Sequence, residues 1–386
     1  MTAAAISNDE QLHWLALKLV PGLGTRRSGQ LVERYRTPQA IFRASTSELE
    51  ATGVSGSVAR SITSGCTFEE AVDQHQKMLD CGAALIPMTD PGYPPRLREI
   101  YDPPVVLFAR GRIELLQSLM LGVVGTRRPT PYGVAAAERL SADLAQAGLT
   151  IASGMARGID TAAHRSALAV GGDTIAVFGC GVDMVYPAEN RKLADELATR
   201  GLLLSEFPMN APAYPQNFPV RNRIISGMSA GVLVIEGAQY SGSSITAKMA
   251  LEQQREVFAV PGSIMSKMSW GPNLLIKQGA KLVQDWNDVV VELPPADRRT
   301  LIAKAQARQG IMTLDQGPEA QSSPEELSPV SRKLLNTLRP DTPIQQDQLF
   351  ETLEDLSSSE IIAALFELEM TGLARQLPGK NFVRVW

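Results

Sequence analysis

The sequence is poor in the features that mark secreted, disulfide-rich or membrane proteins. Its 386 residues include only three cysteines, Cys66, Cys81 and Cys180, with no C-x-x-C pair. This argues against a disulfide framework or a zinc site and suits a reducing cytosol. No apolar run approaches the roughly 18 residues of a membrane span, and the amino terminus lacks a basic-then-apolar signal pattern. We therefore expect a soluble, cytoplasmic protein that does not associate with membranes.

The sequence also lacks an excess of positive charge. Its formal net charge is −4, and its contents of 44% hydrophobic and 20% charged residues are typical of a globular protein. No global positive field would attract a polyanion, so any nucleic-acid or phosphate site must be a local basic patch. The length predicts two or three domains.

Residues 1–77 are predicted to form a small helical domain. Two glycine-containing turns, at 20–24 and 52–56, lie beside apolar helical patterns, as in paired helix-hairpin-helix (SAM-like) motifs. Glycines in such turns can leave backbone N–H groups free to meet a phosphate at a helix start, and Arg26 and Arg27 are close by. The glycines can equally serve only to let two helices turn tightly. The sequence leaves both interpretations open.

Residues 83–297 carry the strongest periodic signal. Helical patterns at 131–148 and 190–201, each ending in glycine, alternate with short β-rich runs. Near-continuous apolar strands that alternate with helices predict a parallel sheet covered on both faces, which is a doubly wound, Rossmann-like α/β fold. The β-rich runs begin at Leu119, Leu149, Thr174, Leu202, Gly231 and Glu256.

Ligands of such sheets bind beyond the carboxyl ends of the strands, so the residues that follow each run form the candidate site. Glycines and small hydroxyls at helix starts let backbone N–H groups bond phosphates, and neighbouring arginines add charge-assisted bonds. The rim of the sheet therefore predicts a phosphate-rich ligand. The segments concerned are residues 125–128, 153–160, 179–181, 236–237 and 241–244.

Two nucleotide-binding motifs are incomplete on this rim. The segment 237–244 has the glycine spacing of a Walker A loop, but Ser243 stands where the lysine is required. The glycine-rich segment that begins at Gly179 has Met184 at the third glycine position of a dinucleotide fingerprint. We therefore do not expect the first segment to bind a nucleotide as a Walker A loop does, or the second to bind a dinucleotide.

Other titratable residues also fall short of a catalytic or metal site. Asp160 and His164 share a helix face, yet two ligands do not make a metal site, and a helix-start Asp with a satisfied partner His is the plainer interpretation. Glu236 follows a strand and could be a general acid, but no nucleophile is evident beside it. We expect a binding protein, not an enzyme, with no cofactor and no metal.

Several long segments resemble the DprA/Smf family of DNA-processing proteins. They include GVVGTRRPTPYG, IASGMARGIDTAAHRSAL, VFGCGVDMVYPAENRKL and the stretch from NFPVRNRIISG to AVPGSI, and they follow the family's order across the middle of the chain. The resemblance implies that the protein binds single-stranded DNA, forms a homodimer through the Rossmann-like domain, and loads RecA recombinase onto incoming strands during natural transformation.

The resemblance also implies a set of DNA-binding residues. Arginines would grip phosphates, backbone amides would orient them, and Phe218 could stack on a base without sequence preference. A plainer alternative keeps Phe218 and Ile224 in the core and leaves Arg221 in solvent. Arg128, Arg157 and Lys248 are further candidates by proximity alone. The residues carried over from the family are Arg127, Ser153, Gly154, Gly158, Phe218, Arg221, Asn222 and Arg223.

Arg221 and Arg223 stand two residues apart, so they can share a direction only in an extended segment or at the start of a helix. Pro219 favours a helix start, because proline occupies the first turn without losing a needed N–H group. We expect both arginines to face solvent in the free protein and to bind phosphates together with Arg127. Asn222 is expected to turn inward and fix their direction.

The carboxyl-terminal part is predicted to be a linker, residues 298–324, followed by a winged helix over residues 325–386. Helical patterns at 330–338, 344–353 and 359–370 precede a hairpin with a Pro-Gly-Lys-Asn turn. The third pattern carries Glu360, Glu367 and Glu369 and neither Lys nor Arg. Phosphate would be repelled by such a helix, so reading of duplex sequence is not expected, and a protein-contact or structural role is preferred.

Two other functional classes remain open at this point. One is a nucleotide or nucleoside-phosphate hydrolase on the Rossmann-like domain, and the other is a transcription regulator that uses the winged helix. The arginine pair in FPVRNR favours a polymer of phosphates over a single nucleotide. The acidic third helix disfavours the regulator.

Overall fold

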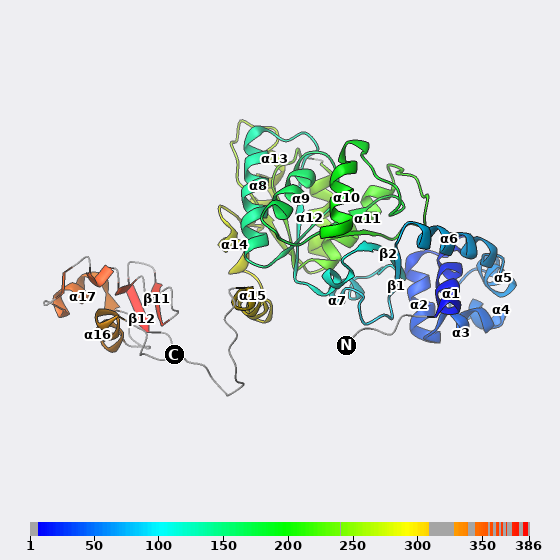
Figure 1. Ribbon diagram of the computed structural model, residues 1–386, viewed down its shortest axis with the longest axis horizontal. Coiled ribbons are helices and arrows are strands. Elements are labelled where there is room, and N and C mark those ends of the chain that lie inside the picture. The colour runs from blue at the N-terminus through cyan, green and yellow to red at the C-terminus, as the bar shows by residue number, and fades with distance from the viewer. Residues whose placement is uncertain are drawn as a thin grey trace. The chain divides into compact units, whose positions relative to one another are not determined.

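A computed structural model describes residues 7–239, 241–308, 328–338, 344–353, 356–357, 360–362, 364–365, 368, 373–377 and 381–384. The chain divides into two compact units, Met1–Ile311 and Met312–Trp386. Each unit has a hydrophobic core of its own. Figure 1 shows the helices and strands with their labels.

The first unit begins with a helical bundle that lies beside strands β1 and β2 (Figure 1). Ser and Thr side chains cap several of these helices: Ser7, Thr37, Ser45 and Ser55 each accept a bond from a backbone N–H of the following helix. Apolar side chains of the bundle, with Trp14 fully buried among them, face inward. The helices are α1 (Asn8–Leu19), α2 (Thr25–Tyr35), α3 (Pro38–Arg43), α4 (Thr46–Glu50), α5 (Gly56–Ser64) and α6 (Phe68–Asp80).

A nine-stranded sheet forms the centre of the first unit, in the order β1-β2-β6-β5-β4-β3-β7-β8-β9. The pairs β1/β2 and β2/β6 are antiparallel, and every other pair is parallel. The strands are β1 (Ala84–Pro87), β2 (Val106–Gly111), β3 (Met120–Val124), β4 (Thr150–Ser153), β5 (Thr174–Phe178), β6 (Leu202–Ser205), β7 (Gly231–Val234), β8 (Glu256–Ala259) and β9 (Lys281–Leu282).

All six β-rich runs expected from the sequence are parallel strands of this sheet, β3 to β8, so the predicted Rossmann-like α/β fold is confirmed. The antiparallel strands β1 and β2 and the short edge strand β9 were not predicted. Helices and 3-10 turns connect the strands: α7 (Pro95–Arg98), η1 (Ile113–Gln117), α8 (Pro131–Gln146), α9 (Ile159–Ala169), η2 (Ala188–Asn190), α10 (Arg191–Arg200), α11 (Asn217–Met228), α12 (Gly242–Glu252), α13 (Trp270–Lys277), α14 (Trp286–Val290) and α15 (Pro295–Arg308).

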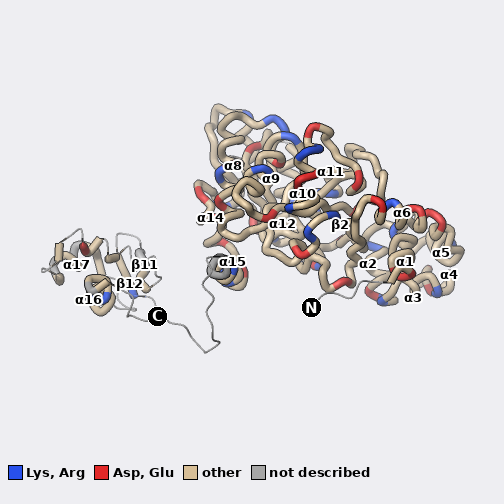
Figure 2. Tube along the Cα trace, in the orientation of Figure 1, with Lys and Arg blue, Asp and Glu red and all other residues tan. Residues whose placement is uncertain are grey.

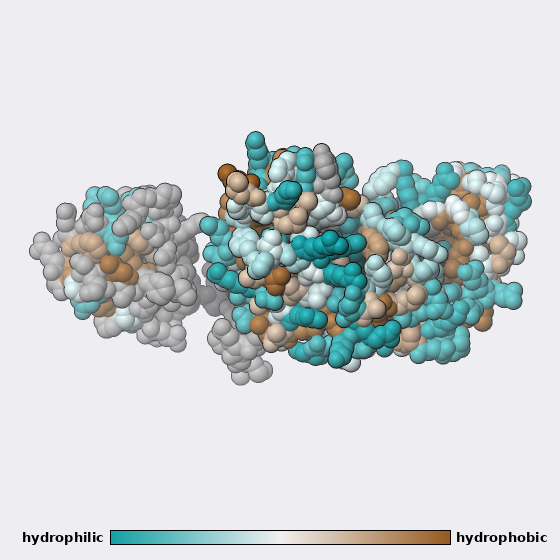
Figure 3. Space-filling model, turned by 90° about the horizontal axis from the view of Figure 1, so that it is seen from above, coloured by the Kyte–Doolittle hydropathy of each residue, from teal (hydrophilic) through white to brown (hydrophobic). Residues whose placement is uncertain are grey.

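The two faces of the sheet pack against different helices. In β3, Leu121 and Val123 join a core with α8 and α9, whereas Met120 and Val124 join the core on the other face with α11 and α12. This alternation is expected of a strand buried on both faces, because successive side chains point to opposite sides. On the face of the first unit shown in Figure 3, hydrophilic residues cover much of the surface.

The bundle and the sheet share one hydrophobic core, although the sequence suggested separate domains at 1–77 and 83–297. The Gln74 amide of α6 bonds both the N–H and the carbonyl of Met209 in the loop after β6. The predicted linker also begins too early, because residues 298–308 belong to α15. Leu301 of α15 is buried, and Lys304 bonds Gly148 and Asp173. The helical period of this polar segment was obscured by its few apolar residues.

The second unit has the elements of a winged helix, as predicted. They are α16 (Pro329–Thr337), α17 (Gln346–Thr352) and a three-stranded sheet in the order β10-β12-β11, which is antiparallel throughout. The strands are β10 (Ile344–Gln345), β11 (Ala374–Leu377) and β12 (Asn381–Arg384). The prediction of an acidic third helix concerns Glu360, which is exposed, and Glu367 and Glu369, which lie outside the described residues.

Candidate nucleic-acid interface

The winding of the sheet reverses between its neighbouring strands β3 and β7. After β3 the chain passes to α8 on one face, and after β7 it passes to α12 on the other. Ligands of open α/β sheets bind in the crevice that such a reversal leaves. A cleft of about 730 Å³ opens at this point, and we call it the switch-point cleft. Its lining includes Gly125, Thr126, Arg127, Arg128, Ala156, Asp160, Tyr186, Phe218, Pro219, Arg221, Asn222, Ser241, Gly242, Ser243, Ile245 and Thr246.

The loop after β3 brings Arg127 and Arg128 to the cleft as exposed side chains. Hydrogen bonds to Glu236 fix this loop: Thr126 N–H donates to the Glu236 carbonyl at 2.8 Å, and the backbone and hydroxyl of Thr130 donate to its carboxylate at 2.9 and 2.6 Å. Neither arginine forms an ion pair with any residue that the structure describes. Their charges are therefore available to a ligand. Figure 2 shows acidic and basic positions interspersed over the first unit, so this charge is local.

Arg221 enters the cleft from the first half of α11, where it is only 4% exposed. Its Nη1 donates to the carbonyls of Gly154 (2.5 Å) and Val177, and its Nε donates to Asn222 Oδ1 at 3.2 Å. These acceptors are all neutral. Burial lowers the pKa of Arg221 to about 10, although the carboxylate of Asp160 opposes this effect. The guanidinium therefore keeps its positive charge near neutral pH without a directly bonded carboxylate.

Gly154 makes room for this guanidinium. A Cβ atom at Gly154 would lie 2.4 Å from Nη1 of Arg221, closer than any ordinary contact. Gly158 has a comparable role: its φ is +77°, and a Cβ there would meet the Thr126 carbonyl oxygen at 2.5 Å. Both glycines therefore position arginine-bearing segments. Ser153 is fully buried, and its hydroxyl donates to the Val123 carbonyl at 2.6 Å, so its side chain joins β4 to β3 and does not face the cleft.

Two aromatic rings line the cleft beside the arginines. Phe218 and Tyr186 have ring centroids 5.5 Å apart, and the guanidinium carbons of Arg127 and Arg221 lie 5.2 and 5.9 Å from the Phe218 centroid. Tyr186 is 48% exposed. Tyr186 was not predicted, although it lies in the segment after β5 on the same rim. Aromatic faces next to cations provide surfaces for stacking bases.

Arg223 does not join this group, so the expectation that the two arginines share a direction is wrong. The expectation that both face solvent is also wrong, because Arg221 is only 4% exposed. The side chain of Arg223 is 6% exposed, and it forms ion pairs with Glu206 at 2.7 Å and Asp102 at 3.2 Å. On a helix, residues two apart point in different directions. The helix start itself is confirmed, because Pro219 lies in the first turn of α11 and Ile224 and Ile225 are buried.

The weaker candidates contribute less. Arg157 is exposed and pairs with Glu189 at 2.5 Å, which partly neutralises it. It lies next to the cleft, in a small hollow with Tyr186 and Phe218. Lys248 is exposed on α12, 3.9 Å from Glu252, and lines neither the switch-point cleft nor the small hollow.

The titratable residues near the cleft have structural partners. The Asp160 carboxylate accepts bonds from the N–H groups of Gly154 and Ala156, while burial raises its pKa and Arg221 opposes that rise. Burial, followed by the charge of Arg221, lowers the pKa of His164 to about 3. His164 Nδ1 bonds Thr174 at 2.7 Å, so Asp160 and His164 have different partners and do not bond each other. Glu236 is buried and fully engaged by Thr130.

Within the described ranges, no group of three or more His, Cys, Asp or Glu side chains could hold a metal ion. Among the same residues, no helix combines the length and the apolar content that crossing a bilayer requires.

Comparison with known proteins places this geometry in a family. Residues 84–294 match the family described as DNA recombination-mediator protein A, and residues 318–380 match the DprA winged helix domain. Protein Smf of Synechocystis sp. is 33% identical over 98% of this chain and 100% of its own length. The DNA processing protein DprA of Bacillus subtilis is 47% identical over 55% of this chain and 72% of its own.

Solved structures show the same fold. DNA processing protein A from Streptococcus pneumoniae has a TM-score of 0.66 at 35% identity, covering 75% of this chain and 99% of that one. DNA processing protein A from Helicobacter pylori, whose structure is described in terms of its single-stranded DNA binding mode, has a TM-score of 0.50 at 30% identity. That match covers 57% of this chain and 96% of the other.

Proposed function

Since the chain belongs to the DNA recombination-mediator protein A family, we propose that it binds single-stranded DNA in the switch-point cleft and delivers the strand to RecA recombinase during DNA uptake. The observation that carries the proposal is the charged guanidinium of Arg221, held among neutral acceptors beside the unpaired Arg127 and the Phe218 ring.

Each group in the cleft suits one part of a single strand. Arg127, Arg128 and Arg221 offer positive charge to phosphates. The α12 start, where Ser241 caps the helix and Gly242 lines the cleft, offers backbone N–H groups to the same anions. The rings of Phe218 and Tyr186 can stack on bases of any sequence, because every base has a π face. Duplex DNA keeps its bases stacked inside the helix and could not use the rings.

Binding without catalysis is part of the proposal. Glu236 is the residue that the sequence offered as a possible general acid. Both of its carboxylate oxygens accept hydrogen bonds from Thr130 at the start of α8. A general acid must direct a proton at the ligand, and a general base must direct a free acceptor at it. The hydrolase alternative therefore predicts turnover of ATP or a nucleoside monophosphate that Glu236→Gln abolishes, and the binding proposal predicts no such turnover.

Three further properties are also part of the proposal. A homodimer formed through the Rossmann-like part, cytoplasmic location and contact with RecA are proposed from family membership. The winged helix is proposed to act in protein contact or structure, because Glu360 is exposed on it.

Titration of the full chain with labelled oligo-dT, a duplex of equal length and thymidine monophosphate tests the proposal. Oligo-dT should bind at least about tenfold more tightly than the duplex, a difference of about 1.4 kcal/mol. Equal affinity for all three ligands, or preference for the mononucleotide, would contradict it. A chain ending at Pro324 should keep its affinity within about tenfold, since the cleft lies in the first unit.

A further inference from the structure

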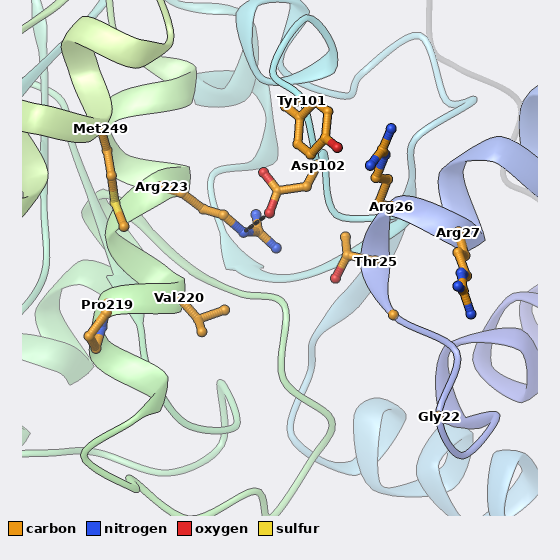
Figure 4. Close-up of a pocket in the computed structure, with 11 residues that line it drawn as sticks. Gly22, Thr25, Arg26, Arg27, Tyr101, Asp102, Pro219, Val220, Arg223 and Met249 are labelled. Atoms are coloured by element: carbon orange, nitrogen blue, oxygen red, sulfur yellow. Dashed lines mark ion pairs between the residues drawn. The ribbon is translucent and has the colours of Figure 1, made fainter.

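A second groove of about 710 Å³ lies between helix α2 of the amino-terminal bundle and the helices α11 and α12 (Figure 4). We call it the α2 groove. Arg26, Arg27 and the glycine turn before them form one wall, and Val220 and Met249 are on the opposite wall. Nothing in the proposed function uses this groove.

The α2 groove continues the switch-point cleft. Phe218 lines the cleft, Pro219 lines both the cleft and the groove, and Val220 lines the groove. These are consecutive residues in the first turn of α11. A polymer that leaves the cleft over Pro219 therefore enters the groove directly, whereas a mononucleotide in the cleft would not reach it.

The α2 wall offers positive charge and free backbone donors. Arg26 and Arg27 are exposed, and neither forms an ion pair with a residue that the structure describes. Gly24 caps α2 without a side-chain bond, and the first turn of α2 contains no acidic residue. The first N–H groups of a helix have no partner within the helix, and its amino end attracts anions. This wall suits phosphates.

Three less polar side chains that line the groove, Tyr101, Val220 and Met249, provide surfaces on which bases can pack. Tyr101 is 70% exposed, and the Arg26 guanidinium carbon lies 4.3 Å from the centre of its ring. Val220 is also exposed, and Met249 is partly exposed beside it. Figure 4 shows the Arg223 side chain reaching into the groove toward Asp102. Its Nη1 is buried and has no hydrogen-bond partner among the described residues.

We infer that a single strand bound in the switch-point cleft continues across Pro219 into the α2 groove, where Arg26 and the α2 amides bind its phosphates and Tyr101 stacks on a base. The inference rests on the proposed function and extends it to the amino-terminal bundle. It assigns a ligand to the first of the two glycine turns.

The second glycine turn supplies a control within the same bundle. Helix α5 begins there, and none of its residues line the α2 groove. Arg60 of α5 is exposed, like Arg26, and forms no ion pair with a described residue. An effect of general positive charge would appear equally at Arg26 and Arg60. An effect of the groove would appear at Arg26 only.

The test measures the salt dependence of binding of the full chain to oligo-dT of about 20 nucleotides, longer than the roughly 4 to 16 that one binding fold covers. The variants are Arg26→Ala, Arg60→Ala, Tyr101→Ala, Tyr101→Phe and Arg127→Ala. Each phosphate contact on a single strand contributes about 0.7 to the slope of log K against log salt. Arg26→Ala should lower the slope by about 0.7, and Arg60→Ala should leave it unchanged. Tyr101→Ala should weaken binding several-fold, with recovery in Tyr101→Phe.

A second measurement uses oligo-dT of about five nucleotides, near the lower end of the single-strand site sizes that proteins cover, and is intended to occupy the switch-point cleft alone. On this probe Arg26→Ala should have no effect, while Arg127→Ala lowers the slope on both lengths. If Arg127→Ala acts and Arg26→Ala does not, or if Arg26 and Arg60 act equally, the inference is overturned and the proposed function stands. If Arg127→Ala has no effect on either length, the proposed function itself fails.

Discussion

Two regions of the molecule receive an arginine from the same turn of α11, and they use it differently. Around Arg221 the hydrogen-bond acceptors are the carbonyls of Gly154 and Val177 and the Asn222 amide. Around Arg223 they are the carboxylates of Glu206 and Asp102. Both side chains are buried. Burial therefore does not separate a binding arginine from a structural one, whereas the charge of the partners does.

The difference has an electrostatic consequence. Carbonyl oxygens hold the Arg221 guanidinium in place without cancelling its charge, so neighbouring groups respond to it: its field contributes to the lowered pKa of His164 and opposes the rise in the pKa of Asp160. Glu206 and Asp102 offset the charge of Arg223 through direct ion pairs, and Glu206 is shared with Lys18 at 3.9 Å. The first arrangement leaves positive potential for an anionic ligand, and the second joins the bundle to the sheet.

Replacement of Arg223 should have the largest effect on stability. Arg223→Ala leaves the buried carboxylate of Glu206 without its closest partner, and breaking a buried pair on one side costs about 3–5 kcal/mol. Urea unfolding of the full chain measures this change. Arg165→Ala, at an exposed position on α9, should stay within about 0.5 kcal/mol of the wild type. A loss below about 1 kcal/mol in Arg223→Ala would show that the pair is not structural.

Gly154→Ala, which displaces the Arg221 guanidinium, should weaken DNA binding and lower stability. In Gly154→Ala the new Cβ would lie 2.4 Å from Nη1, so the guanidinium must leave its carbonyl acceptors. Overpacking of this kind costs about 1–3 kcal/mol. Oligo-dT affinity should fall by about tenfold or more, which is about 1.4 kcal/mol. Gly29→Ala, where a Cβ meets nothing within 4 Å, is the matched control. Full affinity in a folded Gly154→Ala protein would sink the assignment of Arg221.

The pH dependence of stability sharpens the same comparison. Thr174 donates its hydroxyl hydrogen to the Ile151 carbonyl, so His164 Nδ1 must donate to Thr174. Nε2 is buried without a partner among the described residues, and protonation there would place a second charge near Arg221. His164 therefore stays neutral in the folded protein down to about pH 3, whereas in the unfolded chain it binds a proton below about pH 6.5.

Because the unfolded state binds the extra proton, stability should fall as pH is lowered from about 6 toward 4, by about 1.4 kcal/mol per pH unit from this group. Urea midpoints of wild type and His164→Asn across this range measure the effect. The variant should be less stable at pH 7 and show a shallower slope. Parallel pH profiles for the two proteins would mean that His164 is charged in the folded state.

Much of the rim could be predicted from the sequence because glycines and arginines that follow apolar runs leave a clear pattern. Gly154, Gly158 and Arg127 lie at the cleft or shape it, as the pattern indicated. The fold followed from the same runs, since parallel strands buried on both faces are continuously apolar.

Side-chain partners that come from distant segments could not be predicted. Arg223 meets Glu206 from the loop after β6 and Asp102 from the segment before β2, and nothing local in FPVRNR signals either carboxylate. Ser153 is turned into the sheet by a bond to β3, which depends on strand order. Tyr186 was missed because a single aromatic residue in a loop has no periodic context.

The most direct test of the account is the salt dependence of oligo-dT binding by Arg127→Ala, with Arg165→Ala as the control. Both positions are exposed, and neither arginine pairs with a carboxylate among the described residues, so both variants should melt like the wild type. Arg127→Ala should lower the slope of log K against log salt by about 0.7, the contribution of one phosphate contact, and Arg165→Ala should leave it unchanged. Equal slopes in both variants and the wild type would contradict the claim that the switch-point cleft binds the strand.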